Sequence, residues 1–306
     1  MVTFRTILVA LDIDDDAITD SGLAAVEQAL ALARKDGASV TFAHVLDVSD
    51  SVRTAMLNDA GSDAGKRYAS IARVLHGLAA AAEGVAARTA IFFGSHWREL
   101  VREVLRGRYD LVVIGTKRRG IAGRALFGST GNKLLRTCPC PVWVVKAATH
   151  EVRPNILVAH DLTAVGSAAL DVGASMARLQ KAAVHVLSVI EHPEAERFLS
   201  SVDARTREER VSEVRAMLGA QCHAHALDPP AEISVVDGNA YAAILDYIRA
   251  HRIDLLVMGT VARTGVAALL TGNTAENVLP WADCSLVAIK PAHFVSPVTV
   301  DSATDQ

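Results

Sequence analysis

The chain has 306 residues, enough for two domains of ordinary size, each with its own hydrophobic core. Apolar residues make up 51% and charged residues 21%, a globular composition that excludes disordered and collagen-like chains. The formal net charge of -3 gives no general attraction to nucleic acids or to an anionic membrane, so we expect neither as a partner.

Each half of the chain predicts the same alternation of strands and helices. In the first half the apolar runs predict strands over 7–11, 39–48, 87–93, 110–115 and 141–146. In the second half they predict strands over 156–159, 182–190, 232–236, 254–259 and 285–290. Helical spacing marks 22–35 and 61–83 in the first half and 164–180 and 194–218 in the second, and further helices flank each fourth strand.

This alternation predicts an α/β fold with two doubly wound parallel-sheet domains in tandem. Ligands of such sheets bind beyond the carboxyl ends of the strands, at the point where the strand order reverses. Asp12, Asp161 and the loops that follow Gly115 and Gly259 should all lie at this edge.

The two halves are copies of one unit. The segment that begins at Gly94 recurs from Gly238 without insertion or deletion, and the same offset relates Cys140 to Cys284. The first strands are related by an offset five residues longer, and we expect that difference in a surface loop or helix end in the middle of the domains. The boundary between the halves is expected near 147–154.

The loop after each fourth strand carries the pattern of a phosphate site. It runs over 115–130 in the first half and 259–274 in the second, and it ends in Gly-Ser-Thr or Gly-Asn-Thr. Ser129 and Asn273 suit a helix N-cap, and the free N–H groups of a helix start attract phosphate. Strand-exit and helix-cap geometry explain the same residues equally well.

These strings together resemble the universal stress protein family in its tandem form. ILVALD, AHVLD, DLVVIGT, GST and CPCPVWVVK carry the resemblance over nearly the whole chain. It implies a Rossmann-like, adenine-nucleotide alpha-hydrolase-like fold, with domains at 1–148 and 153–292 and a tail at 293–306. It also implies an internal pseudo-dimer in which the two last strands pair, with a further homodimer as an open alternative.

The resemblance assigns ligand-binding roles residue by residue. Asp12 and Asp161 match an acidic residue beside the nucleotide, and Val45 and Val189 match the position whose backbone meets adenine. The phosphate loop is matched by Gly115, Gly128, Ser129, Thr130, Gly259, Gly272, Asn273 and Thr274. Arg118 and Ala262 replace the second glycine of the pattern, so we expect nucleotide binding mainly in the second half.

Other candidates have a structural and a functional interpretation. The basic cluster of Lys117, Arg118, Arg119 and Arg124 fits a solvated loop better than an anion or nucleic-acid contact. Cys138, Cys140, Cys222 and Cys284 are expected to be reduced, the first two as buried thiols rather than a metal or redox site.

Histidines complete the candidates. His223 and His225 would share one side of a strand, which raises a metal site as the weaker interpretation. His44, His160 and His185 lie within or at the end of apolar strands, where a hydrogen-bonded structural histidine is the default interpretation. His160 adjoins Asp161, so it is the one to test as a ligand contact or a pH-sensitive group.

These observations predict a cytoplasmic stress-response protein that binds a small molecule and does not catalyse. The ligand would be ATP or a related adenine nucleotide, or an apolar molecule, and no cofactor or metal is required. No Ser-His-Asp set or paired-carboxylate site is present to support catalysis. A weak ATPase or phosphotransferase at the same edge is the alternative. The first residues lack the features of a signal peptide, and no apolar run reaches the roughly 18 residues of a membrane span.

Overall fold

The computed structural model describes residues 2–14, 17–118, 125–126, 129–146, 154–191, 204–260, 273–278 and 280–300. The chain divides into two compact units. One contains Thr3–Ala147 together with His293–Gln306, and we refer to it as the first domain. The other contains Met1–Val2 together with Ala148–Ala292, and we refer to it as the second domain.

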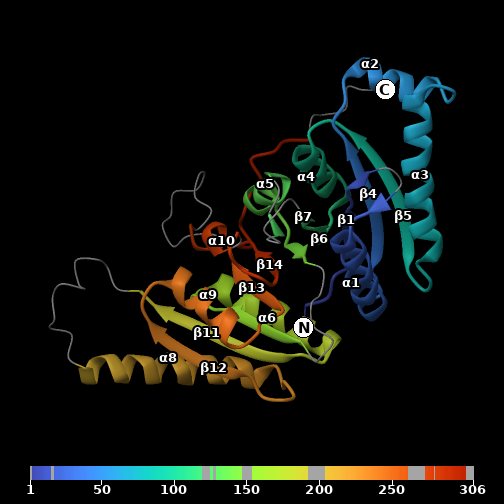
Figure 1. Ribbon diagram of the computed structural model, residues 1–306. Coiled ribbons are helices and arrows are strands. Elements are labelled where there is room, and N and C mark those ends of the chain that lie inside the picture. The colour runs from blue at the N-terminus through green and yellow to red at the C-terminus, as the bar shows by residue number, and fades with distance from the viewer. Residues whose placement is uncertain are drawn as a thin grey trace. The chain divides into compact units, whose positions relative to one another are not determined.

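The first domain is a five-stranded parallel sheet with helices between its strands (Figure 1). Its strands are β1 (Thr6–Ala10), β4 (Ser39–Leu46), β5 (Ala86–Phe93), β6 (Leu111–Gly115) and β9 (Val142–Val145). Its helices are α1 (Asp20–Asp36), α2 (Asp50–Asn58), α3 (Asp63–Ala81), α4 (His96–Gly107) and α5 (Ser129–Thr137). Two short hairpins pair β2 (Ile13–Asp14) with β3 (Ala17–Ile18), and β7 (Lys117–Arg118) with β8 (Ala125–Leu126).

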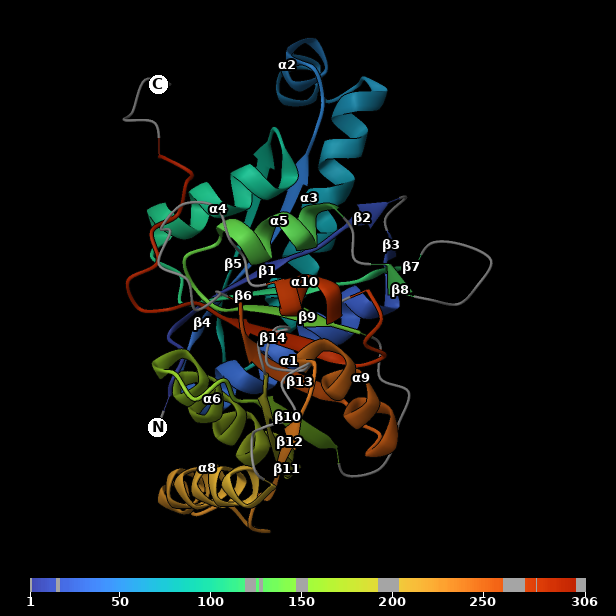
Figure 2. The same cartoon turned by 90° about the vertical axis from the view of Figure 1, so that its left-hand side faces the viewer.

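The second domain repeats this plan. Its strands are β10 (Asn155–Ala159), β11 (Ala183–Ile190), β12 (Glu232–Asp237), β13 (Leu255–Gly259) and β14 (Ser285–Ile289). Its helices are α6 (Ala164–Gln180), α8 (Ala204–Ala224), α9 (Ala240–Ala250) and α10 (Asn273–Val278). Figure 2 shows α6 and α8 next to each other, and a salt bridge joins His225, just after α8, to Asp171 of α6.

Both sheets have the strand order of a Rossmann-type half. The order is β5-β4-β1-β6-β9 in the first domain and β12-β11-β10-β13-β14 in the second, and every pairing within each is parallel. Successive strands are added on one side of β1 up to β5 and on its other side from β6 onwards, so the strand order reverses between β1 and β6. The same reversal occurs between β10 and β13. The predicted α/β fold with two tandem doubly wound domains is therefore confirmed.

The strands are apolar because helices cover both of their faces. Ile7, Leu8 and Val9 of β1 are fully buried, as are Ile156, Leu157 and Val158 of β10. Helix starts are fixed by side chains: the Thr19 hydroxyl accepts a hydrogen bond from the amide of Gly22, and Thr163 caps α6 in the same way. No helix among the described residues is long and apolar enough to cross a membrane.

Two details differ from the sequence-based expectation. The segment after β4 contains a separate helix, α2, that the apolar spacing did not indicate. The length difference between the repeats lies directly after the first strand, where the β2–β3 hairpin separates Asp12 from Thr19. In the second domain only Leu162 separates Asp161 from the equivalent cap, Thr163.

Candidate ligand site at the strand ends

A cavity of about 500 Å³ lies at the carboxyl ends of the first-domain strands, where the strand order reverses. The ends of β1, β4 and β6 form its floor, and the starts of α4 and α5 reach its rim. It is lined by Ala10, Leu11, Asp12, Thr19, Gly22, Ala43, Val45, His96, Leu100, Ile114, Gly115, Thr116, Ser129, Thr130, Gly131 and Val144. The volume falls within the range of small-molecule sites.

Five residues that the sequence assigned to a site line this one cavity: Asp12, Val45, Gly115, Ser129 and Thr130. They come from strands and a helix that are far apart in the sequence and meet only through the sheet. Gly128, which was predicted with them, lies outside the described residues. Helix α5 begins at Ser129 itself, so this residue stands at the first helical position rather than at the expected N-cap.

His96 is a lining residue that the sequence analysis did not identify. It begins α4, directly after the turn at Gly94 and Ser95 that follows β5. The sequence could have indicated His96, because it comes just after the predicted third strand (β5). Residues just beyond the carboxyl ends of the parallel strands all lie at the same edge of the sheet. Together with Asp12, it supplies the titratable side chains among the described residues that line the cavity.

The glycine at the end of β6 serves the packing of α1. A Cβ added to Gly115 would lie 2.7 Å from the backbone nitrogen of Gly22 and from the backbone carbon of Ser21. The hydroxyl of Ser21 donates a hydrogen bond to the carbonyl of Thr116, which ties the helix start to the strand end. The close approach of α1 is therefore sufficient to explain a glycine at position 115. Because Gly115 and Gly22 both line the cavity, this packing also shapes one of its walls.

His44 of β4 supports the turn that leads to the cavity residue Asp12. Its Nδ1 lies 2.9 Å from the carbonyl oxygen of Leu11, so the ring holds the turn that leads to Asp12. Burial lowers the pKa of His44, although the Leu11 carbonyl and the charge of Asp12 act in the opposite direction. At the equivalent position of the second domain, Ser188 is buried, and its hydroxyl lacks a hydrogen-bond partner among the described residues.

In the second domain Asp161 is engaged in the cap of α6. Its Oδ1 accepts hydrogen bonds from the amide of Thr163 at 3.1 Å and from the hydroxyl of Thr163 at 2.6 Å. This is possible because the second domain lacks a counterpart of the β2–β3 hairpin, so Asp161 and Thr163 are close in sequence. Asp12 and Asp161 match in sequence but differ in their surroundings.

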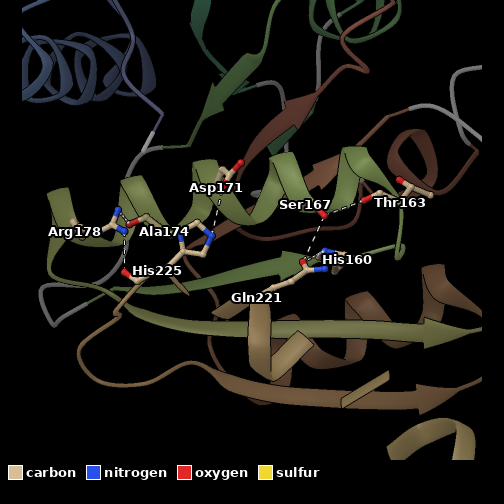
Figure 3. A network of polar contacts seen from close by, with 8 residues as sticks. All are labelled: His160, Thr163, Ser167, Asp171, Ala174, Arg178, Gln221 and His225. Carbon is tan, nitrogen blue, oxygen red and sulfur yellow. Dashed lines mark hydrogen bonds and ion pairs between the residues drawn. The ribbon is translucent and has the colours of Figure 1, made fainter. Parts of the chain in front are cut away.

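His160 is held between α8 and the turn before α6 (Figure 3). Its Nδ1 accepts a hydrogen bond from the amide of Leu162 at 3.0 Å, so the neutral ring donates from Nε2 to Oε1 of Gln221 at 3.1 Å. Gln221 belongs to α8, and its Oε1 also accepts from Ser167 of α6. Burial lowers the pKa of His160. His160 is therefore a hydrogen-bonded structural histidine, because both of its ring nitrogens have partners within the protein.

Larger side chains fill the second-domain edge. Ala10 pairs with Ala43 in the first sheet, and the equivalent pair in the second sheet is Ala159 with Leu187. Leu187 is only 1% exposed. Val189 and Gly259 stand at the ends of β11 and β13 as predicted from the repeat.

The predicted second-domain phosphate loop is only partly described. Gly272 and the rest of 261–272 lie outside the described residues. Asn273 and Thr274 begin α10, so Asn273 stands at its first helical position, not at the expected N-cap.

Of the remaining sequence candidates, His225 and two cysteines have structural contacts, and the basic cluster lies outside the described side chains. His223 and His225 do not share a strand face, because α8 continues to Ala224; His225 instead forms a salt bridge with Asp171 at 3.2 Å. The thiols of Cys138 and Cys140 are buried, and their hydrogen bond and burial raise the pKa of Cys140. The side chains of the basic cluster at 117–124 lie outside the described residues.

Comparison with known proteins identifies the family. The sequence profile of the Universal stress protein family matches residues 3–146 and 153–290. The chain belongs to the universal stress protein family. It contains two such domains in tandem, and over most of its length it resembles universal stress protein E.

Two of these relatives show the extent of the similarity. Universal stress protein E of Photorhabdus laumondii subsp. laumondii is 23% identical over 329 residues, which cover 97% of this chain and 98% of that protein. Universal stress protein E of Escherichia coli K12 is 26% identical over 220 residues, which cover 67% of this chain and 68% of that protein.

Solved structures have the same architecture. A crystal structure described as a universal stress protein from Pseudomonas aeruginosa UCBPP-PA14 has a TM-score of 0.69 and 25% identity, with 95% of each chain covered. A universal stress protein from Archaeoglobus fulgidus DSM 4304 has a TM-score of 0.62, with 93% of this chain and 98% of that chain covered. At 16% identity, the second similarity shows the fold alone.

Proposed function

We propose that this tandem universal stress protein is a cytoplasmic stress-response protein that binds an adenine nucleotide in its first-domain cavity. One observation carries the proposal: a single cavity of about 500 Å³ unites Asp12, Val45 and the start of α5. These are the positions to which the family resemblance assigns contacts with the nucleotide. Four free cysteines, all buried, are consistent with a reducing compartment.

The lining fits the parts of a nucleotide. Ala43, Val45, Leu100 and Val144 offer an apolar surface that suits a purine base. Backbone N–H groups at the start of α5 favour a phosphate, since the helix dipole is positive there. The carboxylate of Asp12 suits the hydroxyls of a ribose, because it accepts hydrogen bonds when ionised.

The choice of the first domain revises the sequence-based preference for the second. That preference was based on Arg118, which replaces a glycine of the family pattern. In the second domain, however, Leu187 and His160 replace Ala43 and Leu11, and both are buried. Binding in the second domain stays a prediction, because residues 261–272 lie outside the described residues.

The test is native mass spectrometry of the full chain with magnesium and ATP. We expect one added nucleotide mass for the unmodified protein and none for Ala43→Leu, which copies the second-domain residue into the cavity. Leu187→Ala is the matched control, because it removes bulk at the equivalent position and should leave binding in the first domain unchanged. Far-UV circular dichroism checks that Ala43→Leu is folded.

The outcomes separate the alternatives. A nucleotide mass that folded Ala43→Leu retains in full would move the site to the second domain. Absence of any nucleotide mass at millimolar ATP would overturn the proposal and favour an apolar ligand instead. We propose binding without turnover, since Asp12 and His96 are the only titratable groups among the described lining residues. Sustained phosphate release that Ala43→Leu abolishes would instead establish the weak ATPase.

A further inference from the structure

Three potential metal ligands converge at the amino-terminal ends of β11 and β12 in the second domain. His185 and Glu232 are directly paired across these two strands. His251 follows α9 as its C-cap residue. One ligand atom from each of the three side chains lies within 4.8 Å of the other two. This cluster is at the edge of the sheet opposite to the strand ends that form ligand sites.

Neighbouring groups hold the two imidazoles in place. The Tyr247 ring stacks on His251, with ring centroids 3.9 Å apart and an interplanar angle of 13°. Nδ1 of His185 lies 3.2 Å from the Tyr247 hydroxyl and 3.4 Å from Oε2 of Glu232. The carbonyl of His251 accepts a hydrogen bond from the Asn155 side chain at 3.1 Å, which anchors the end of α9.

The first domain shows that the fold does not require this cluster. Thr41 pairs with Arg88 at the strand positions that His185 and Glu232 occupy in the second domain. The repeat places Gly107 at the position of His251. There the Tyr109 hydroxyl donates to the Thr41 hydroxyl at 2.9 Å, without any imidazole. At these three positions the two histidines and the carboxylate are therefore particular to the second copy, and Arg88 stands in the first copy where Glu232 stands in the second.

We propose that His185, Glu232 and His251 bind a divalent transition-metal ion, with Zn²⁺ as the best-suited ion. Two imidazole nitrogens and one carboxylate oxygen form a ligand set typical of zinc sites that keep a fourth position for water. Ligand atoms of a tetrahedral zinc ion are roughly 3.4 Å apart, given metal–ligand distances near 2.1 Å. The side chain of Glu232 is 57% exposed and can move to close the cluster, whereas His185 is held by the sheet.

The hydroxyls of Tyr247 and Ser234 complete the surroundings. They lie 3.3 Å apart, and Tyr247 also lies 3.5 Å from Oε1 of Glu232. Hydroxyls at this distance orient a ligating carboxylate or a bound water, and loss of such partners commonly weakens metal binding by about 10- to 100-fold. Tyr247→Phe tests this support without removing a ligand or the aromatic stack.

The experiment is calorimetric titration of the metal-free full chain with Zn²⁺ alone, repeated with Co²⁺ to record absorption spectra. We expect one ion for each chain with micromolar affinity, and Co²⁺ absorption bands typical of nitrogen and oxygen ligands. His251→Gln and Glu232→Gln should each abolish this binding. The side chains of His251 and Glu232 are at least partly exposed, so these variants leave the buried His185 in place. His223→Gln removes an exposed histidine of the same domain and is the matched control.

Every outcome decides the proposal. Binding that is lost in the two ligand variants and kept in His223→Gln supports the site. Binding that survives in both ligand variants, or that only His223→Gln removes, overturns it, as does the lack of saturable binding in the unmodified protein. Thermal unfolding adds a second measurement: Zn²⁺ should raise the melting temperature of the unmodified protein, and chelation should reverse the increase. A ligand variant that folds but shows the same increase also overturns the proposal.

Discussion

Buried histidines stand at or near the carboxyl end of a central strand in each domain. His44 lies against the Leu11 carbonyl in the first domain, and in the second His160 joins Gln221 of α8 to the turn before α6. Burial lowers the pKa of both, so the neutral ring is the form that the fold accommodates. These residues are therefore structural contacts whose protonation couples folding to pH.

Acidification should destabilise the protein through these histidines. Because the folded-state pKa of His160 lies below the unfolded value of about 6.5, the unfolded chain binds more protons between the two values. The contribution of neutral His160 to the free energy of unfolding is thus fully present above about pH 6.5, and it is lost as the pH falls through the folded-state pKa. Each unit by which the pKa is lowered contributes about 1.4 kcal/mol.

Urea unfolding at pH 7.5 and pH 5.5 measures this effect. His160→Gln should be less stable at pH 7.5, because the contacts of the ring are lost, but it should lose less stability on acidification. An equal loss in the variant and the unmodified protein would contradict the role of His160. His223→Gln is the control, since His223 is exposed on α8.

At the scale of elements, the same glycine has different neighbours in the two domains. A Cβ on Gly115 would lie 2.7 Å from backbone atoms of Ser21 and Gly22. Only a movement of the start of α1 could relieve this clash. A Cβ on Gly259 would meet the Cγ1 atom of Val165 at 2.7 Å, which is a side-chain atom rather than a backbone atom. The repeat preserved the residue although only one copy packs it against backbone.

Gly115→Ala should therefore destabilise the protein by about 1–3 kcal/mol, as overpacking does. Gly259→Ala should change the free energy of unfolding by less than about 1 kcal/mol, because reduced freedom of the unfolded chain offsets the contact. Denaturant unfolding of the two variants compares them directly. Equal costs would show that the backbone contact of Gly115 is not what requires glycine.

At the scale of the whole molecule, the C-terminal tail belongs with the first domain although it follows the second in sequence. The Ser296 hydroxyl donates a hydrogen bond of 2.7 Å to the carbonyl of Thr137, which is the last residue of α5. Carbonyls in the last turn of a helix lack partners within the helix, so this contact supplies one. The tail thus stabilises the helix whose start lines the cavity.

Removal of residues 293–306 should loosen the end of α5. We expect faster amide exchange near Cys138, whose amide bonds to the carbonyl of Leu134, and unchanged exchange in β10 and β11. Hydrogen–deuterium exchange with mass spectrometry measures both segments in one experiment. Ser296→Ala should produce a smaller change in the same direction. Unchanged exchange around Cys138 in the truncated chain would show that the tail contact is not stabilising.

The sequence by itself determined the duplication, the two parallel sheets and the edge at which Asp12, Val45, Gly115, Ser129 and Thr130 meet. It could do so because strand periodicity, glycine positions and helix starts are local signals that a repeat presents twice. Helix α2 and the first-helical positions of Ser129 and Asn273 differed because helix boundaries depend on packing as well as local pattern.

Only the tertiary structure decided how each equivalent position is used. It turned Asp161 and His160 inward, to the cap of α6 and to Gln221, while Asp12 lines a cavity. It also brought His185, Glu232 and His251 together from three separate elements. Asp161 reaches Thr163 because the second domain lacks the hairpin that separates Asp12 from Thr19. The contact of His160 with Gln221 and the histidine cluster depend on distances between residues far apart in the chain, which the local residue pattern does not specify.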